Sequence, residues 1–347
     1  GEGIHLMITS VSYKGVVNIG IVTYNSVNDL PECFAALKRQ TYPEIRIIIL
    51  DNHSTDDTVA WISNHAPECE LIINSENIGF GRAHNQIIAY CTPGMDDYYM
   101  LLNPDVTLRD NYIETVVNAL TETGGGWASG KLLQKDSNHR PLNRIYSAGQ
   151  GVRRDGFVIN IGEGMVDDGQ FEERREVFLV SGAAPILRGA LIAAIAPDGE
   201  LFDVTMFMYA EDIDMGWRAR RQSWRCWYVP EAVAYHRGGN IHWATRAQAV
   251  GNVHISVLKN AYWFDLITYN APLIIVDLCL RLVLTPSMGR IALTHTVRHA
   301  LYALRKRWKP QVSRREMLSW YRWSKAQPTQ QPRGLIQRIR VYMGRRG

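Results

Sequence analysis

The sequence VVNIGIVT, at residues 16–23, is a short apolar run that ends in polar residues. Such a run predicts a buried β-strand. A helical pattern follows it and stops before Pro43. The next apolar run, RIIIL at residues 46–50, predicts a second strand that ends at Asp51. This order of strand, helix and strand predicts two parallel strands joined by a crossover helix.

The same alternation continues beyond this unit. Helices are expected at residues 58–65 and 82–90, and strands at residues 71–73 and 98–102. The fold class predicted is therefore α/β, with a doubly wound, mostly parallel sheet. Ligands bind such sheets at the carboxyl ends of the strands. The polar segments expected there are Thr23-Tyr24-Asn25, Asp51-Asn52, Asn77 and Asn103-Pro104-Asp105.

The later part of the chain follows a different pattern. From residue 127 to 169 the alternation weakens, and we expect loops and short strands there. After about residue 244 the patterns become helical. We therefore expect one domain at residues 1–245, with a regular half at about 16–110 and a less regular half at about 111–245. A helical, basic region is expected at residues 246–347.

Charge is distributed unevenly along the 347 residues. Residues 281–347 hold 16 Lys and Arg and one acid, Glu316, so they carry +15. The whole chain has 38 Lys and Arg and 34 Asp and Glu, so residues 1–280 hold 22 basic and 33 acidic residues and carry −11. An acidic body with a basic tail suggests that the tail meets an anionic surface, although a tail that only aids solubility is the alternative.

Two features bear on the cellular compartment. The five cysteines are scattered, with no C-x-x-C pair, which argues against a disulfide framework or a zinc site and suits a reducing compartment. Residues 1–10 lack a basic stretch followed by a long apolar run, so we expect no signal peptide there.

Three acidic positions could carry chemistry. Asp105, in Asn103-Pro104-Asp105, follows a predicted strand, where a carboxylate can bind a divalent cation that bridges a diphosphate; most such tripeptides are ordinary turns. Glu211 and Asp212 begin a predicted helix, where acids usually act as caps. The apolar approach at residues 202–209 would desolvate them, raise their pKa and favour a general base.

Two other motifs are less specific. His236 follows an extended segment and is more often a structural residue, although a neutral imidazole could complete a metal site. Gly79-Phe80-Gly81 is similar to part of a glycine-rich phosphate loop. The full G-x-G-x-x-G is lacking, because no third glycine follows before Asn85, which counts against a dinucleotide-binding dehydrogenase.

In combination these segments are more specific than each is alone. Their ordered series resembles glycosyltransferase family 2, in particular its rhamnosyltransferase-like branch, over about residues 16–240. The series is Ile21-Val22-Thr23-Tyr24-Asn25, Asp51-Asn52-His53-Ser54-Thr55-Asp56, Asn77-Ile78-Gly79-Phe80-Gly81 with Asn85, Leu102-Asn103-Pro104-Asp105, Val180-Ser181-Gly182-Ala183, Phe207-Met208-Tyr209-Ala210-Glu211-Asp212-Ile213-Asp214 with Arg218, and His236-Arg237-Gly238-Gly239.

The resemblance implies a GT-A-type catalytic domain at residues 1–245, with a nucleotide-sugar half at about 16–110 and an acceptor half at about 111–245. It also implies a set of site residues. Asp212 matches the family's catalytic base and Glu211 its neighbour. Asp105, Asn103 and His236 match its metal site for Mg²⁺ or Mn²⁺. Asn103 replaces the first acid of the family's D-x-D motif but can still offer a carbonyl ligand. The positions that match donor-binding segments are Thr23, Tyr24, Asn25, Asp51, Asn52, Asn77, Gly79, Phe80, Gly81, Arg82, Asn85, Asn103, Gly182 and Arg218.

The implied reaction is an inverting sugar transfer to a glycan or polyprenyl-linked acceptor hydroxyl in cell-surface polysaccharide synthesis. The resemblance favours rhamnose from dTDP-rhamnose, with galactofuranose or N-acetylglucosamine from a UDP donor as alternatives. A nucleotidyltransferase would carry a basic, glycine-rich loop where this chain has Thr23-Tyr24-Asn25. A non-catalytic sugar-binding protein on a degenerate transferase fold is the remaining alternative. The oligomeric state cannot be inferred from the sequence.

The basic tail carries an apolar stripe at helical spacing. The stripe consists of Leu293, Val297, Leu301, Leu304 and Trp308 and is flanked by Arg290, Arg298, Arg305, Lys306, Arg307 and Lys309. The apolar run at residues 271–284 contains Asp277 and Arg281 and falls short of the ~20 residues that span a bilayer, so we expect it to be buried or interfacial. The tail is expected to dock on the cytoplasmic face of an anionic membrane. Packing on the catalytic domain is the alternative, and no nucleic-acid-binding module is recognised.

Overall fold

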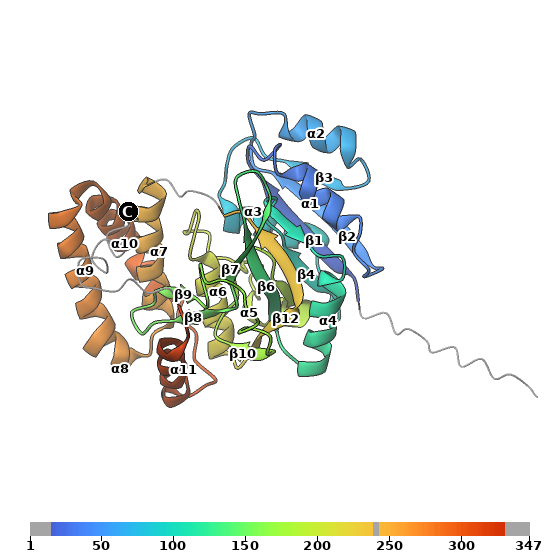
Figure 1. Ribbon diagram of the computed structural model, residues 1–347. Helices are drawn as coiled ribbons and strands as arrows, with labels where there is room; N and C mark the ends of the chain where they lie inside the picture. Colours follow the sequence, from blue (N-terminus) through green and yellow to red (C-terminus); the bar gives the residue numbers. More distant parts are fainter. Residues whose placement is uncertain (1–14, 239–242, 330–347) are drawn as a thin grey trace, which may run out of the picture.

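The computed structural model describes residues 15–238 and 243–329. Four parallel strands form the N-terminal half of one sheet, in the spatial order β3-β2-β1-β4 (Figure 1). They are β1 (Val17–Thr23), β2 (Ile45–Asp51), β3 (Glu70–Ile73) and β4 (Tyr98–Leu101). The helices between them are α1 (Leu30–Leu37), α2 (Thr58–His65) and α3 (Phe80–Cys91). The predicted parallel half is confirmed.

The order of these strands determines where a ligand can bind. The chain runs from β1 out to β2 and β3, and then returns to place β4 on the other side of β1. The direction of winding therefore changes between β1 and β4, and such a switch point leaves a crevice beyond the carboxyl ends of the strands. The interior positions of β1, Val17, Ile19 and Ile21, are fully buried because both faces of the sheet are covered.

The sheet continues beyond β4 in the order β11-β6-β12-β10. Of the neighbouring pairs in this half, only β6–β12 is parallel. Short strands β5 and β7 pair with β12 and β6, while β8 and β9 form a separate two-stranded sheet. The strands are β5 (Val106–Leu108), β6 (Trp127–Lys135), β7 (Pro141–Ser147), β8 (Gln150–Val152), β9 (Val158–Asn160), β10 (Arg175–Val177), β11 (Ile186–Arg188) and β12 (Cys226–His236). The helices are α4 (Tyr112–Thr123), α5 (Gly189–Ile195) and α6 (Glu211–Arg221).

The expectation of only loops and short strands after residue 127 was wrong for β6. This nine-residue strand lies in the middle of the sheet and is buried almost throughout. Its charged residues are neutralised by distant partners: Lys131 contacts Asp167 and Glu172, and Lys135 contacts Glu32. Buried charges that are paired in this way are tolerated inside a sheet.

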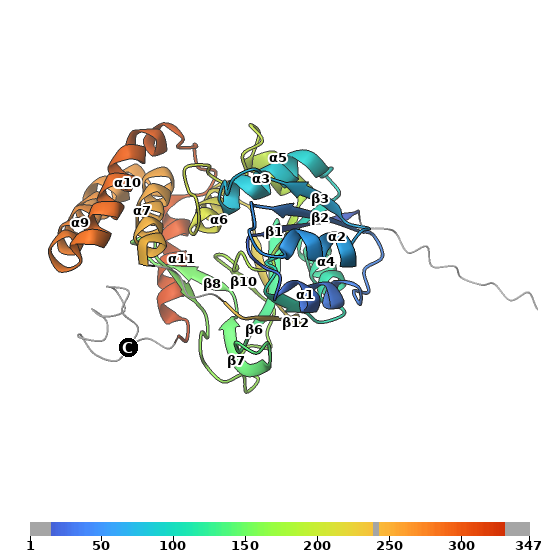
Figure 2. The same ribbon diagram turned by 90° about the horizontal axis from the view of Figure 1, so that it is seen from above.

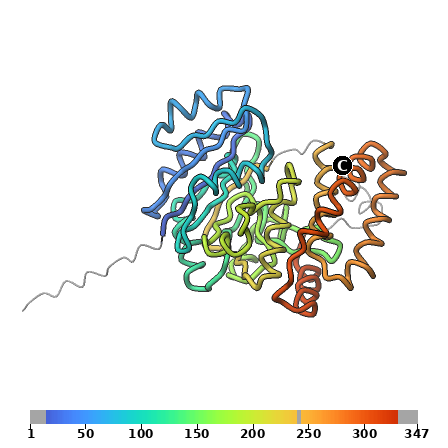
Figure 3. Tube along the Cα trace, turned by 180° about the vertical axis from the view of Figure 1, so that it is seen from behind, coloured from blue at the N-terminus to red at the C-terminus, as the bar shows by residue number. Residues whose placement is uncertain are grey.

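The C-terminal part is helical, as expected, and lies beside the second half of the sheet (Figures 2 and 3). It consists of α7 (Trp243–Asn260), α8 (Trp263–Asp265), the π-helical turn η1 (Leu266–Asn270), α9 (Ala271–Leu284), α10 (Pro286–Arg305) and α11 (Arg314–Ala326). The boundary expected after residue 245 falls inside α7. A single cluster of buried apolar side chains joins Tyr99 on β4, Trp217 on α6, Val257 on α7 and Tyr321 on α11.

Helix α7 connects the two regions through polar contacts as well. The Lys259 ammonium lies 2.6 Å from an oxygen of Asp203 and 2.7 Å from one of Asp214. The Asn252 amide donates to the carbonyl oxygens of Met208 and Tyr209, at 3.0 and 2.8 Å. Packing on the catalytic domain, the alternative left open for the tail, therefore holds for α7.

The predicted apolar stripe on α10 is only partly exposed. Val297 and Leu301 face outward, whereas Leu293, Leu304 and Trp308 pack against buried apolar clusters. The helical segment before it is longer than the run at residues 271–284. Within the described residues, Trp263–Leu284 forms 22 continuous helical residues with mean hydropathy 1.7, which by length and composition alone could cross a membrane.

Candidate active site

A cavity of about 1590 Å³ lies at the switch point of the sheet. It is bordered by the segments that follow β1, β2, β3 and β4, by the start of α6, by the end of β12 and by α7. The structure brings ten of the expected site residues to its wall: Tyr24, Asn52, Asn77, Phe80, Asn103, Asp105, Gly182, Glu211, Asp212 and His236. The polar segments that follow separate strands thus meet in one place.

Asp105 and His236 form a pair because β5 and β12 are antiparallel neighbours. Residue 236 is paired with Val106, which places the two side chains together. The Nε2 atom of His236 lies 3.2 Å from Asp105 Oδ1, and the Gly238 amide donates to Oδ2 at 3.1 Å. Burial acts to raise the pKa of Asp105, but its hydrogen bond with His236 and the charge of Arg237 outweigh burial and hold the pKa below its usual value. Asp105 is therefore an anion at neutral pH.

Two buried atoms at this site lack hydrogen-bond partners within the described residues. They are the second ring nitrogen of His236, Nδ1, and the amide oxygen of Asn103, Oδ1. No group of three or more His, Cys, Asp or Glu side chains that could hold a metal occurs in residues 15–238 and 243–329. Asn103 and Asp105 nevertheless fit a Mg²⁺ or Mn²⁺ ion, since such ions are commonly held by one or two protein oxygens together with phosphate oxygens of the ligand.

Asp212 occupies the first turn of α6, opposite the loop that carries Gly182. Its Oδ2 accepts from the Gly182 amide at 3.2 Å, and its Oδ1 accepts from the Ile213 amide at 2.8 Å. A Cβ atom at residue 182 would lie 3.0 Å from Oδ2, so glycine allows the carboxylate to approach. Burial raises the pKa of Asp212, although its backbone hydrogen bonds oppose the shift. A carboxylate with these properties can accept a proton.

Glu211 is buried beside Asp212 and has an oxygen, Oε2, without a partner in the described chain. Burial, together with the negative charge of Asp212, raises the pKa of Glu211 to about 8. The two residues before it, Tyr209 and Ala210, have left-handed backbone angles, with φ of 68° and 70°. Such strain in non-glycine residues persists only where surrounding contacts fix it, and Asn252 of α7 supplies two of them.

Other expected donor-binding residues connect the loops at the rim of the cavity. Asp51 accepts from the Thr23 hydroxyl at 2.9 Å and from the Ser54 amide at 2.8 Å. Asn25 accepts from the Thr55 amide at 2.8 Å. These bonds hold the segments after β1 and β2 together, so Thr23, Asn25 and Asp51 support the cavity without lining it.

The Gly79-Phe80-Gly81 turn serves close packing. A Cβ atom at residue 79 would lie 2.3 Å from the carbonyl oxygen of Phe207, and one at residue 81 would lie 2.9 Å from Phe202 Cβ. The Phe80 amide already donates to the Phe207 carbonyl at 2.9 Å. These glycines therefore admit the segment at residues 202–207.

The structure does not bring three further expected donor-binding residues to the cavity wall. Asn85 is buried and exchanges two hydrogen bonds with the backbone of Phe202, at 2.7 and 2.9 Å. Arg82 is exposed on α3. Arg218 points into the core, where it donates to the carbonyl oxygens of Ile195 and Leu201. Its guanidinium group is occupied in holding that segment and does not reach the cavity wall.

Sequence reasoning missed several residues of the cavity wall. One is a cation near Asp105: Lys135, which contacts Glu32 at 3.1 Å. Arg237, which belongs to the His236-Arg237-Gly238-Gly239 segment of the sequence, also lines the wall and contacts Asp29 at 2.7 Å. The wall residues Gln150, Asn160 and Glu163 come from the irregular part after residue 127, which shows no pattern in the sequence.

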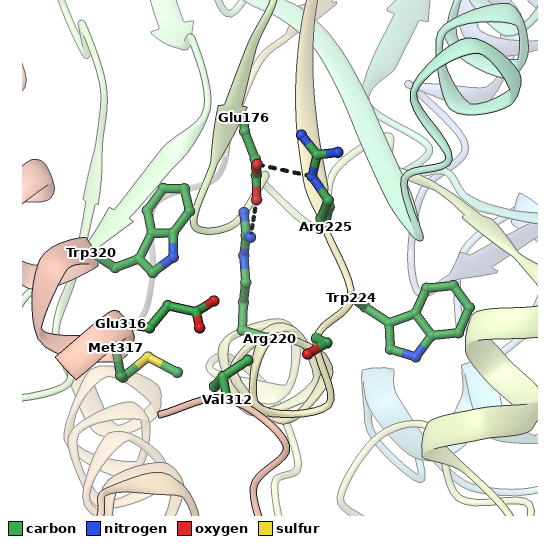
Figure 4. Close-up of a pocket in the computed structure, with 9 residues that line it drawn as sticks. Glu176, Arg220, Trp224, Arg225, Val312, Glu316, Met317 and Trp320 are labelled. Atoms are coloured by element: carbon green, nitrogen blue, oxygen red, sulfur yellow. Dashed lines mark hydrogen bonds and ion pairs between the residues drawn. The ribbon is translucent and has the colours of Figure 1, made fainter. Parts of the chain in front are cut away.

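A second cavity, of about 220 Å³, lies between α6, β10 and α11 (Figure 4). Glu176 pairs with Arg220 and, at 3.0 Å, with Arg225, while the Trp320 ring lies 4.3 Å from the Arg220 guanidinium carbon. The Arg220 nitrogens donate to Glu176 and to the carbonyl oxygens of Val177 and Phe178. The cavity holds none of the expected site residues, and its buried cation already has protein partners.

Comparisons with known proteins agree with this geometry. The family described as "Glycosyl transferase family 2" matches residues 18–182. An N-acetylglucosaminyl-diphospho-decaprenol L-rhamnosyltransferase of Mycobacterium tuberculosis is 26% identical over 241 residues, which cover 64% of this chain and 76% of that protein. The glycosyltransferase SunS of Bacillus subtilis is 36% identical over 76 residues, 22% of this chain and 17% of that protein.

A solved structure of GalNAc-T7 with UDP, GalNAc and Mn²⁺ shares the fold, with a TM-score of 0.56 at 10% identity. The match covers 75% of this chain and only half of that one. This neighbour and the mixed α/β architecture confirm the predicted GT-A-type fold.

Proposed function

Since this chain is a glycosyltransferase with a family 2 domain at residues 18–182, we propose that it transfers a sugar, with inversion, from a nucleoside diphosphate sugar to a hydroxyl of a lipid-linked glycan. The observation that carries the proposal is the meeting of Asp212 and the Asp105–His236 pair in one cavity at the switch point. The pKa of Asp212 is raised, which suits a base that takes a proton from the acceptor. The pKa of Asp105 is lowered, which suits an anion that holds a cation at the leaving diphosphate.

The nucleotide lies, in this proposal, over the ends of β1 and β2. Tyr24, half exposed at the rim, and Asn52, buried in the wall, belong to the segments that Asp51 and Asn25 hold in place. The diphosphate extends toward Asn103 and Asp105 after β4. Binding across a switch point in this direction is the general rule for wound sheets.

Asp212 takes the proton from the acceptor hydroxyl, and the acceptor oxygen forms its bond to the anomeric carbon. The bond from that carbon to the diphosphate oxygen breaks on the opposite face, and the leaving diphosphate keeps the electron pair. Glu211 lies next to Asp212 in the same wall, and its buried carboxyl group raises the negative charge near the base when it is ionised. Positioning of the hydroxyl against a fixed carboxylate supplies much of the rate.

The leaving diphosphate needs positive charge. Asn103 and Asp105 would hold a Mg²⁺ or Mn²⁺ ion, which when bound neutralises developing negative charge on the diphosphate. Lys135 and Arg237 stand in the same wall and add to the positive potential there. The mycobacterial relative is an L-rhamnosyltransferase that acts on N-acetylglucosaminyl-diphospho-decaprenol, which favours rhamnose as the sugar and a polyprenyl-diphosphate-linked glycan as the acceptor.

The test is a panel of nucleotide sugars assayed with N-acetylglucosaminyl-diphospho-polyprenol as acceptor, with and without Mg²⁺ or Mn²⁺. Transfer from dTDP-rhamnose is expected. Transfer from UDP-galactofuranose or UDP-N-acetylglucosamine alone would overturn the sugar assignment while leaving the reaction class intact. Binding of a sugar nucleotide without transfer or hydrolysis of any donor would instead identify a non-catalytic sugar-binding protein.

A further inference from the structure

The outer face of the helix Trp263–Leu284 is apolar and exposed. Ile267 is 66% exposed, Ile275 61% and Val283 77%, and Val297 and Leu301 of α10 extend the surface. Large apolar side chains that lie close together on a surface usually mark a contact with another apolar phase. We name the surface formed by Trp263, Phe264, Ile267, Ile275, Val276 and Val283 the α9 face.

The inner face of the same helix is held by protein. Asp277 lies 3.3 Å from the Nε2 atom of His254 on α7 and 2.7 Å from Nε of Arg281. The Asn270 amide donates to the carbonyl oxygen of Arg154 at 2.7 Å. Helix α10 packs along α9 and carries Arg290 and Arg298 on its exposed side. A segment fixed in this way to α7 and α10 cannot cross a bilayer alone, so its apolar side must lie parallel to a surface.

The exposed charge of residues 263–315, which include the α9 face, has one sign. Within residues 263–315 both acids are buried in ion pairs: Asp265 with Arg314 at 2.6 Å and Asp277 with Arg281. The exposed charged side chains in that range are Arg290, Arg298, Arg305, Lys309 and Arg315. An apolar face with a cationic rim complements anionic lipid. Two copies of the face would bring like charges together, which opposes a homodimer through it.

We propose that the α9 face is seated at the boundary between headgroups and acyl chains of an anionic bilayer, with Arg290 and Arg298 at the phosphate level. The proposal does not rest on the sugar donor, because lipid binding needs no substrate. It places the active-site cavity close to the membrane: Arg246, Ala249 and Val253 of α7 line the cavity, while Val250 of the same helix packs against Leu278 of α9.

The experiment is flotation of the full-length chain with phosphatidylcholine vesicles, with and without phosphatidylglycerol, at low and high salt. Wild type is expected to float with the anionic vesicles and to be released by salt. Ile275→Glu should reduce binding by about tenfold or more, because it puts a charge in place of an exposed apolar side chain that would enter the bilayer. The matched control is Ile73→Glu, since Ile73 is 58% exposed at the far end of the sheet; it should bind like wild type.

Thermal melts of both variants establish that they fold, and Val283→Glu replaces Ile275→Glu if the latter does not. Equal flotation of the α9-face variant and wild type would overturn the proposal, as would the absence of wild-type binding. A wild-type dimer that Ile275→Glu dissociates, with no vesicle binding, would assign the face to a second copy instead.

Discussion

The Asp212 carboxylate is held by the backbone amides of Gly182 and Ile213, and burial raises its pKa. As the proposed base it acts on the acceptor and not on the nucleotide. Asp212→Asn should therefore lower transfer by about 10²–10⁴-fold and leave donor affinity close to that of wild type. Steady-state transfer and calorimetric donor titration measure the two effects. Asp198→Asn, at an exposed carboxylate, is the control. Transfer within threefold of wild type would sink the assignment of the base.

Asp105 has no second carboxylate in its motif, since Asn103 stands at the other position. Asp105→Ala should therefore weaken donor binding measured with Mg²⁺ or Mn²⁺, and chelation should reduce transfer by the wild-type chain. If the chelated wild type keeps full activity and the variant binds donor normally, the leaving diphosphate depends on Lys135 and Arg237 instead.

Glu211 contributes a dependence of stability on pH. Burial raises its pKa to about 8 in the folded chain, from an ordinary value near 4.5. The folded state then binds the proton more tightly than the unfolded state, so this group favours folding at low pH and loses that contribution as pH rises from about 4.5 to about 8. Glu211→Gln should remove this loss of stability, because glutamine does not ionise. The melting temperature of the variant, relative to that of wild type, should therefore rise between pH about 4.5 and about 8. A constant difference would show that the pKa of Glu211 is the same in the folded and the unfolded chain.

At the scale of elements, prediction from the sequence succeeded where a pattern is local. The strands β1, β2 and β4 are apolar runs, and each ends at a polar segment that reaches the cavity or its rim. Strand β6 was missed because Lys131 and Lys135 interrupt its apolar character. Their partners, Asp167 and Glu32, are 36 and 103 residues away in the chain. The inward position of Arg218 was likewise not visible in the sequence, since only the folded chain shows which carbonyl groups it contacts.

The turn before α3 offers a test of why its glycines are present. Gly79 has φ of 86°, and a Cβ atom there would meet the Phe207 carbonyl. Gly199 has φ of 80° with open space around it. Gly199→Ala incurs the penalty of a positive φ, about 1–2 kcal/mol. Gly79→Ala incurs more, because its ψ of 165° lies in a region almost confined to glycine and because its Cβ atom would clash with residue 207. Chemical denaturation should show the larger loss for Gly79→Ala. Equal losses would mean that the contact with residue 207 relaxes without cost.

At the scale of the whole molecule, α7 joins the catalytic domain to the C-terminal helices. Lys259→Met would leave Asp203 and Asp214 without their shared cation, and removing one partner of a buried ion pair costs about 3–5 kcal/mol. Lys306→Met removes an exposed pair with Asp198 and should cost less than about 1 kcal/mol.

Urea unfolding should be a single transition in wild type, because one apolar core includes side chains of the sheet and of the C-terminal helices. Two separate transitions would show that the sheet and the C-terminal helices unfold independently.

The uneven distribution of charge has a mechanical consequence. The acidic residues belong mainly to the sheet-bearing end, and the exposed cations of α10 lie at the opposite end, beside α9 (Figure 1). The molecule is therefore an electric dipole, and the field near an anionic surface exerts a torque on it before any contact is made. The helical end is turned toward the lipid and the sheet is turned away. Each encounter then begins in one orientation, so the first collision need not be followed by a rotational search.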